Sequence, residues 1–204
     1  YDVLPAAEGC WIGIGDVAGH GMSAAVIMLM VQSSVASLCR KSPGARPSEI
    51  VGTLNEVLLE NIRNRMRESE HVTLTLLRFQ HDGNVLFAGA HEDIVVLRAH
   101  DGHSETIPTT GTWLGARHGV EDVTTDGLIH LDPGDIMLLY SDGLIEAQNA
   151  AGEAFGLERV CRLLETNHQA AVDEIHARIW AAVEAWSVRQ DDDVTLLVVR
   201  RSQQ

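Results

Sequence analysis

The chain has 204 residues and a formal net charge of −14, a length that allows one sizeable hydrophobic core or two small ones. A nucleic-acid surface needs clustered lysine and arginine, so this charge argues against nucleic-acid partners. An acidic balance suits a domain that gathers divalent cations, or simply a soluble domain, and composition does not choose between them. Three cysteines, Cys10, Cys39 and Cys161, are far apart among apolar neighbours, which predicts small buried side chains and a reducing, cytoplasmic location.

The most apolar stretch of the chain covers residues 24–38 and contains Gln32 and three serines. It is too short to span a bilayer comfortably, so we expect no membrane insertion. No signal peptide precedes the first predicted strand. The chain starts without methionine in the middle of apparent structure, so we expect it to be part of a longer protein.

Hydrophobic patterning predicts an ordered series of strands and helices. A buried strand at residues 10–14 precedes a glycine-rich turn, and an Ala- and Met-rich helix at 22–38 follows it. A second helix begins near Pro47, which suits a first helical turn. From residue 72 the apolar period changes to two, which indicates strands. These strands are predicted at residues 72–77, 85–88, 94–97, 105–107, 120–131, with a bend near 126–127, and 136–140. Two helices at 156–165 and 169–186 follow, and a last strand at 194–200, apolar on both faces, is expected to be central.

This order predicts the fold class. Helices come in two pairs, and the strands between them are mostly connected by hairpins, which favours antiparallel sheets with helices packed outside. We therefore expect an α+β domain with an antiparallel β-sandwich flanked by helix pairs, in α-β-β-α layers. Nothing resembling a linker interrupts residues 1–204, so a single domain is predicted.

The glycine-rich turn has the sequence GDVAGHG, residues 15–21. Its glycines let the backbone turn sharply and let a ligand approach closely. A carboxylate placed between two apolar elements is costly to bury without a partner or cation. Asp16 is therefore predicted to be a metal-site or phosphate-site residue; the alternative is a tight turn with an exposed aspartate.

Two further carboxylates occupy comparable places. Asp142 follows the strand at 136–140, and Asp192 precedes the last strand within the run 191–193. If that last strand runs antiparallel to the strands before Asp16 and Asp142, all three carboxylates meet at one sheet edge. Like charges gathered in this way repel unless cations hold them. Oxygen-only ligands favour Mg²⁺ or Mn²⁺, and two such cations would activate a water for attack on a phosphoryl ester. Taken alone, residues 191–193 could equally be a solvated acidic turn.

A dinucleotide-binding site is the first rival interpretation. Gly13, Gly15 and Ala18 have the spacing of a dinucleotide fingerprint between a strand and a helix. Asp16 would then stand where the pyrophosphate must bind, and the hairpin-rich middle of the chain contradicts a parallel sheet. We therefore do not favour this interpretation.

Several motifs occur in the order of a known family. They are GDVAGHG at 15–21, PGD at 133–135, YSDGLIEA at 140–147 and DDVT at 192–195, with GTWLG at 111–115 and GEAFG at 152–156 as secondary matches. Together they resemble the SpoIIE/RsbU-type serine phosphatases of the metal-dependent type 2C (PPM) protein phosphatase family, over essentially the whole chain.

The resemblance implies a metal-dependent protein serine/threonine phosphatase with two Mn²⁺ or Mg²⁺ ions. It implies that Asp16 bridges the metals, that the Val17 carbonyl binds one of them, and that Asp142 and Asp192 complete the ligands. The implied substrate is phosphoserine or phosphothreonine on a small anti-anti-sigma (STAS-type) protein in sigma-factor control. Such domains usually follow a sensor or receiver domain, and the resemblance also implies a possible homodimer.

Two departures from the family pattern stand out. GAHED at 89–93 replaces a common Asn-Ala-Gly-His segment, and the Gly-Gly-Asp that usually precedes Tyr1 and Asp2 is absent. We expect the first strand to be missing and one metal to bind weakly for that reason. The rival from a different class is a catalytically weak or inactive phosphatase-fold module that docks a partner protein.

Overall fold

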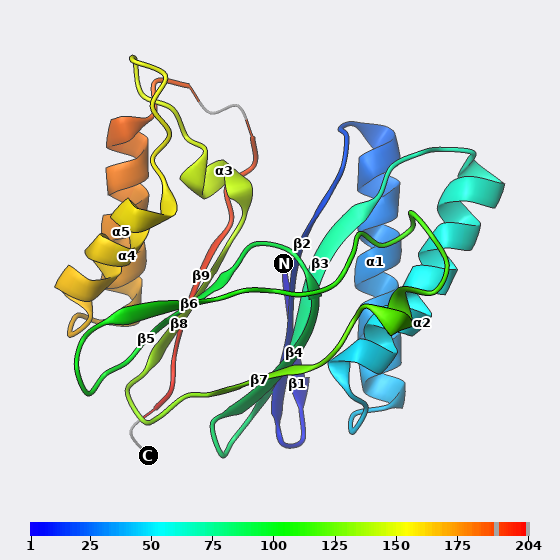
Figure 1. Ribbon diagram of the computed structural model, residues 1–204, viewed down its shortest axis with the longest axis horizontal. Coiled ribbons are helices and arrows are strands. Elements are labelled where there is room, and N and C mark those ends of the chain that lie inside the picture. Colours follow the sequence, from blue (N-terminus) through cyan, green and yellow to red (C-terminus); the bar gives the residue numbers. More distant parts are fainter. Residues whose placement is uncertain (190–191, 203–204) are drawn as a thin grey trace. The chain divides into compact units, whose positions relative to one another are not determined.

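The computed structural model describes residues 1–189 and 192–202. The chain divides into two compact units, which are described separately below (Figure 1). The first unit comprises Tyr1–His91 and Thr109–His130, and the second comprises Glu92–Pro108 and Leu131–Gln204.

The first unit contains a five-stranded antiparallel sheet in the order β1-β2-β3-β4-β7. Its strands are β1 (Asp2–Ala6), β2 (Gly9–Val17), β3 (Val72–Gln80), β4 (Asn84–Ala90) and β7 (Gly127–His130). Its helices are α1 (Met22–Lys41) and α2 (Pro47–Leu59), which continues as the π-helical segment η1 (Glu60–Met66), and the short 3-10 helix η2 (Val120–Asp122).

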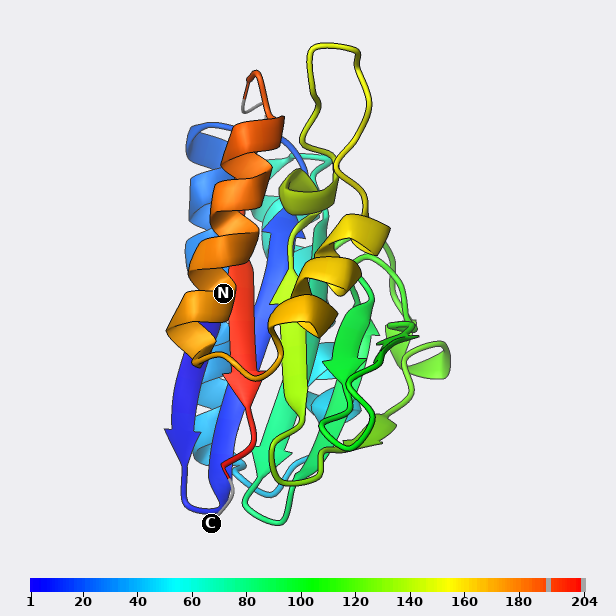
Figure 2. The ribbon, with the colours of Figure 1, turned by 90° about the vertical axis from the view of Figure 1, so that its left-hand side faces the viewer.

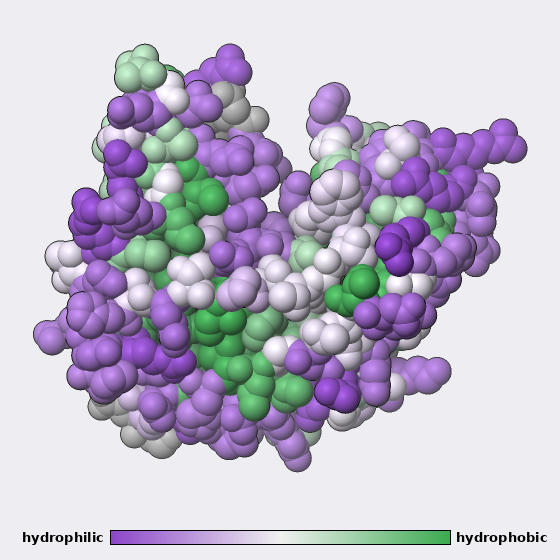
Figure 3. All heavy atoms as spheres, viewed as in Figure 1, coloured by the Kyte–Doolittle hydropathy of each residue, from purple (hydrophilic) through white to green (hydrophobic). Residues whose placement is uncertain are grey.

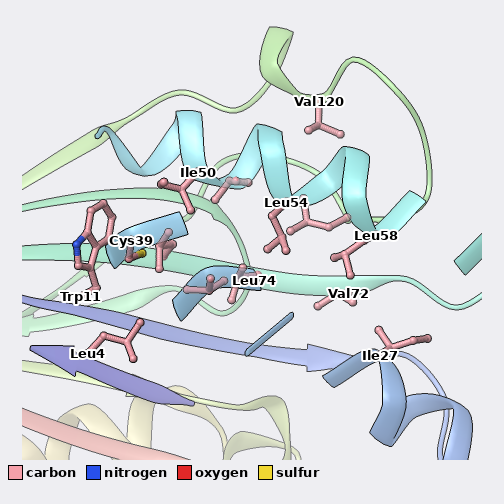
Figure 4. Close-up of a cluster of buried hydrophobic side chains, with 14 of the residues drawn as sticks. Leu4, Trp11, Ile27, Cys39, Ile50, Leu54, Leu58, Val72, Leu74 and Val120 are labelled. Carbon is pink, nitrogen blue, oxygen red and sulfur yellow. The ribbon is translucent and has the colours of Figure 1, made fainter. Parts of the chain in front are cut away.

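The core of the first unit lies between the sheet and its two helices. Leu54 and Leu58 of α2 are fully buried and point toward Leu74 and Val72 of β3 (Figure 4). Burying one such aliphatic side chain contributes about 1.5–3 kcal/mol. This burial holds α1 and α2 against one face of the sheet.

The second unit contains a four-stranded antiparallel sheet in the order β6-β5-β8-β9. Its strands are β5 (Ile94–Leu97), β6 (Ser104–Ile107), β8 (Ile136–Tyr140) and β9 (Leu196–Arg200), and its helices are α3 (Asp142–Ile145), α4 (Leu157–Asn167) and α5 (Val172–Trp186). Helices α4 and α5 cover one face of this sheet (Figure 2). Their buried residues Leu164, Ile175 and Ile179 pack against the strands.

The predicted fold class is confirmed at this level: two antiparallel sheets, each with a pair of helices packed on it. The predicted strand at 120–131 is wrong in its first part, where η2 forms and only Gly127–His130 pairs with β4. Asp126 explains the break, because its carboxylate accepts hydrogen bonds from Ser48 N and Oγ at 2.9 and 2.7 Å. The expectation that the last strand is central is also wrong, since β9 lies at an edge of its sheet.

Helix α1 is longer than the predicted 22–38. It has 20 residues and meets the length and composition of a membrane-spanning helix, so the argument that this run is too short is wrong. Within the first unit it contributes Ile27, Val35 and Cys39 to the core, and it exposes Met28 and Leu29. Hydrophilic residues cover most of the face of each unit seen in Figure 3.

The three cysteines are free thiols. Cys39 is buried, as predicted, whereas Cys10 and Cys161 are half-buried. Burial raises the pKa of the Cys39 thiol to about 11, against a small opposing effect of Arg40. A thiol with so high a pKa is a poor nucleophile at neutral pH, which suits a packing role.

Candidate metal site

In the first unit, Asp16 lies near the end of β2. It pairs with Thr73 of β3, and Val17 pairs with Val72. Asp16 N donates to Thr73 Oγ1 at 3.3 Å, and that hydroxyl lies 2.9 Å from His91 Nδ1. The strand register therefore holds the Asp16 backbone, while its carboxylate stays exposed to solvent.

The glycines around Asp16 are required by the backbone. A Cβ on Gly15 would lie 2.2 Å from the carbonyl oxygen of Thr73. Gly19 and Gly21 have φ values of 98° and 82°, in a region that side chains rarely adopt. The sharp turn that the sequence predicts between strand and helix is confirmed, and α1 begins directly after it at Met22.

In the second unit, the ends of β8 and β9 are joined by hydrogen bonds. Tyr140 pairs with Leu196, and Ser141 N donates to Thr195 O at 3.1 Å. Ser141 Oγ donates to Asp193 O at 3.0 Å and accepts from Thr195 N at 2.8 Å. Ser141 therefore links the end of β8 to the segment that precedes β9 through hydrogen bonds.

These hydrogen bonds of Ser141 bring Asp142 and Asp192 to one end of the sheet. Gly143 packs so closely on the partner segment that a Cβ there would lie 2.5 Å from Asp193 O and 3.4 Å from the Cβ of Asp192. Asp142 Oδ1 accepts from Gly143 N, and Asp192 Oδ1 accepts from Asp193 N, each at 2.8 Å. The predicted antiparallel pairing of these two strand ends is confirmed.

The premise that one sheet edge carries all three carboxylates is wrong for Asp16, whose strand belongs to the other sheet. Residue 191, the first of the acidic run 191–193, lies outside the described residues. Among residues 1–189 and 192–202, no group of three or more His, Cys, Asp or Glu side chains stands ready to hold a metal ion. The ligand set Asp16, Val17, Asp142 and Asp192 therefore stays a prediction.

Glu92 lies within electrostatic range of Asp142 and two other carboxylates. Burial raises the pKa of the Glu92 carboxyl, and the negative charges of Asp142, Asp93 and Glu146 raise it further. Such mutual repulsion favours a cation at this end of the sheet. The sequence analysis did not predict that Glu92 and Glu146 belong near Asp142. The available signal for Glu92 was its place in GAHED at 89–93, the segment that departs from the family pattern.

A cavity of about 220 Å³ opens beside Asp192 in the second unit. Its lining includes Gly143, Glu146, Trp180 and Arg189. The cavity combines an aromatic surface with charges of both signs next to the predicted ligand Asp192, so this end of the unit is open to a ligand.

Asp135, in the PGD motif, has a structural role. Its carboxylate is almost fully buried, pairs with Arg98 at 2.8 Å and accepts from Ala99 N and Asp132 N at 2.8 and 3.0 Å. Burial alone would raise the pKa of Asp135, but these hydrogen bonds and the Arg98 charge outweigh it and lower that pKa. The motif therefore ties the turn before β8 to the end of β5.

The donor atoms predicted for the metals are all oxygens, which is the set that Mg²⁺ and Mn²⁺ prefer. Asp16 and Asp192 are exposed and Asp142 is half-buried, so a cation can reach each of them. The residues present therefore fit hard divalent cations.

Solved structures define the class of fold. The SiaA-PP2C domain of Pseudomonas aeruginosa matches 98% of this chain and 78% of its own, with a TM-score of 0.81 and 21% identity. RsbX in complex with magnesium matches 96% of this chain and 83% of its own, with a TM-score of 0.62 and 10% identity. The chain therefore has the fold of the PP2C phosphatases.

The family model for Stage II sporulation protein E (SpoIIE) matches residues 6–202, and the chain belongs to the SpoIIE family. It is 28% identical to the phosphoserine phosphatase RsbU of Bacillus subtilis over 206 residues, covering 98% of this chain and 58% of RsbU. It is 27% identical to protein IcfG of Synechocystis over 217 residues, covering 94% of this chain and 33% of that relative. The chain thus spans between a third and three fifths of these relatives.

Proposed function

We propose that the chain is a metal-dependent protein serine/threonine phosphatase domain. The observation that carries this proposal is the pairing of β8 with β9, which holds the Asp142 and Asp192 carboxylates at one end of a sheet. Membership of the SpoIIE family and the similarity to a phosphoserine phosphatase support it.

The proposed ligands of a Mn²⁺ or Mg²⁺ pair are Asp16, the Val17 carbonyl, Asp142 and Asp192. Two such cations supply activation of the attacking water and neutralisation of charge on the phosphoryl group. Ser141 and Gly143 position the second-unit ligands, because they fix the spacing between the β8 end and the segment before β9. Thr73 likewise positions the backbone of Asp16, because its hydroxyl accepts a hydrogen bond from Asp16 N. RsbX, a structural relative, was crystallised in complex with magnesium.

The proposed substrate is a phosphoserine or phosphothreonine residue on a small regulatory protein of the STAS-type anti-anti-sigma class. The similarity to RsbU over 98% of the chain supports this choice. Control by an upstream sensor or receiver domain is part of the proposal. Helix α1 begins at Met22, directly after the glycine-rich turn that follows Asp16 and Val17. A displacement of α1 would therefore move both residues.

Hydrolysis of para-nitrophenyl phosphate tests the proposal. We expect turnover that requires Mn²⁺ or Mg²⁺, stops with EDTA, and returns when the cation is restored. Turnover that persists in EDTA would contradict the metal mechanism. A folded protein without turnover at any cation concentration would support the alternative, a module that docks a partner.

A further inference from the structure

His71 and Trp113 form an aromatic stack at the end of the first unit's sheet. Their ring centroids lie 4.4 Å apart, with 23° between the ring planes. Trp113 is nevertheless 55% exposed, although tryptophan is one of the side chains that gain most from burial. The indole is therefore supported on one side and open on the other, which is the arrangement of a contact surface.

The backbone around Trp113 is held on two sides. Leu114 N donates to Val72 O at 2.8 Å, and Val72 N donates to Leu114 O at 3.0 Å. Gly115 N donates to Oδ1 of Asn55, a fully buried residue of α2, at 3.0 Å. Trp113 is thus fixed before any ligand binds, and such pre-organisation lowers the entropic cost of binding.

The stack points away from the core of the first unit. Val72 and Leu114 both point into the core between the sheet and its helices. Side chains alternate between the two faces of extended chain, so the residues directly before them, His71 and Trp113, lie on the opposite face.

Asp16 lies on that same face. Asp16 is paired directly with Thr73, and directly paired residues present their side chains on one face of the sheet. His71 precedes Thr73 by two positions and is therefore a diagonal neighbour of Asp16, at roughly 7–8 Å between Cα atoms. Ala18 N also donates to His71 O at 2.9 Å.

The distance from Asp16 to Trp113 corresponds to a short length of substrate chain. The antiparallel bridge between Val72 and Leu114 places Trp113 opposite Thr73, on the side of β3 away from Asp16, so Asp16 and Trp113 lie two strand spacings apart, about 10 Å. An extended polypeptide advances about 3.3–3.6 Å per residue. A phosphorylated residue at Asp16 would therefore place a residue two or three positions away beside Trp113. The open face of an indole ring packs favourably against an apolar or aromatic side chain.

We propose that Trp113, supported by His71, receives an apolar side chain located two or three residues from the phosphorylated residue of the protein substrate. Trp113 would thereby be a specificity-determining residue that distinguishes polypeptide from small phosphate esters. This inference rests on the proposed phosphatase function, since it requires the phosphorylated residue to bind at Asp16.

Three probes test this inference with Mn²⁺ present: para-nitrophenyl phosphate and two phosphoserine decapeptides. One peptide carries leucine, and the other carries glycine, at the second and third positions on each side of the phosphoserine. For Trp113→Ala, we expect kcat/KM for the leucine peptide to fall about tenfold more than that for para-nitrophenyl phosphate. Trp113→Phe should recover most of this loss. The glycine peptide should respond to Trp113→Ala like the small ester.

Leu128→Ala is the matched control, because Leu128 is 65% exposed on β7 of the same unit. It should leave the ratio between leucine peptide and small ester unchanged. Equal losses on all three probes in Trp113→Ala, or no loss on any, would overturn the inference. So would a wild-type enzyme that hydrolyses the ester but neither peptide. A wild-type protein with no metal-dependent ester hydrolysis would instead refute the proposed function itself.

Discussion

Gly143→Ala is the substitution whose effect follows most directly from the geometry of the second unit. A Cβ at this position would lie 2.5 Å from Asp193 O and 3.1 Å from the carbonyl carbon of Asp193, whereas real Cβ contacts essentially never fall below 3.0 Å. The obstructing atoms belong to the backbone, so no side-chain rotation relieves the collision. The segment with Asp192 and Asp193 must move away from Asp142.

The size of the effect can be estimated from this overlap. Reaching an ordinary contact requires a shift of about 0.5–1 Å, and overpacking of this kind costs about 1–3 kcal/mol of folding free energy. Misplacing a catalytic group by about 1 Å costs up to roughly a hundredfold in rate. We therefore expect Gly143→Ala to stay folded, to need at least about tenfold more Mn²⁺ for half-maximal turnover, and to turn over more slowly.

The assay is hydrolysis of para-nitrophenyl phosphate over a Mn²⁺ titration, with urea unfolding to measure stability. Gly44→Ala is the matched control, because no atom beyond the adjacent residues lies within 4 Å of a Cβ at that position. It should match the wild type in both measurements. If Gly143→Ala were folded and had the wild-type Mn²⁺ dependence and rate, the reasoning that links the spacing of Asp142 and Asp192 to metal binding would be refuted.

Three further substitutions probe separate parts of the account. Asp142→Asn should keep the wild-type urea midpoint and lose most Mn²⁺-dependent turnover, because an amide is a poorer ligand for a hard cation; wild-type turnover would place the metal elsewhere. Asp135→Asn should lose about 2–3 kcal/mol at pH 7, because Arg98 and two backbone amides lose a charged hydrogen-bond acceptor. Because the pKa of Asp135 is lowered, the stabilisation by its carboxylate is present above about pH 4 and disappears as the pH falls through the folded-state pKa. The urea midpoints of variant and wild type should therefore converge in acid. A difference that stays constant with pH would contradict the stabilising role of the Asp135 carboxylate. Asn55→Leu should cost about 2–3 kcal/mol in urea unfolding, because Gly115 N loses its buried partner; an unchanged midpoint would show that the contact is dispensable.

Much of the fold could be predicted because local pattern and tertiary structure agree. The strands at 94–97 and 136–140 have the predicted bounds, since each is an apolar run bounded by turn residues. The strand predicted at 120–131 was expected to bend near residues 126–127, and β7 does begin at Gly127. Its first part was wrong, and no local pattern reveals the hydrogen bonds between Asp126 and Ser48, 78 positions away. Helix α3 is only four residues long, too short for a helical period to show.

The candidate site was predictable only in part for a related reason. The pairing of strand ends could be inferred for Asp142 and Asp192, because each flanks a strand with a clear apolar pattern. Sequence patterns do not show which strands share a sheet, so the assignment of the Asp16 strand to the same sheet was wrong. Glu92 was missed because its acidic neighbours Asp142 and Glu146 are distant in sequence, and only the fold brings them near it.

Asp16, Asp142 and Asp192 are the proposed ligands of a pair of divalent cations. Anomalous scattering from crystals of the protein grown with Mn²⁺ tests this claim most directly. At a Mn²⁺ concentration high enough to fill the weaker of the two sites, we predict two manganese peaks about 3.5–4 Å apart, with oxygens of all three carboxylates within coordination distance. Peaks that involve other residues, or manganese held by Asp142 and Asp192 without Asp16, would contradict the account.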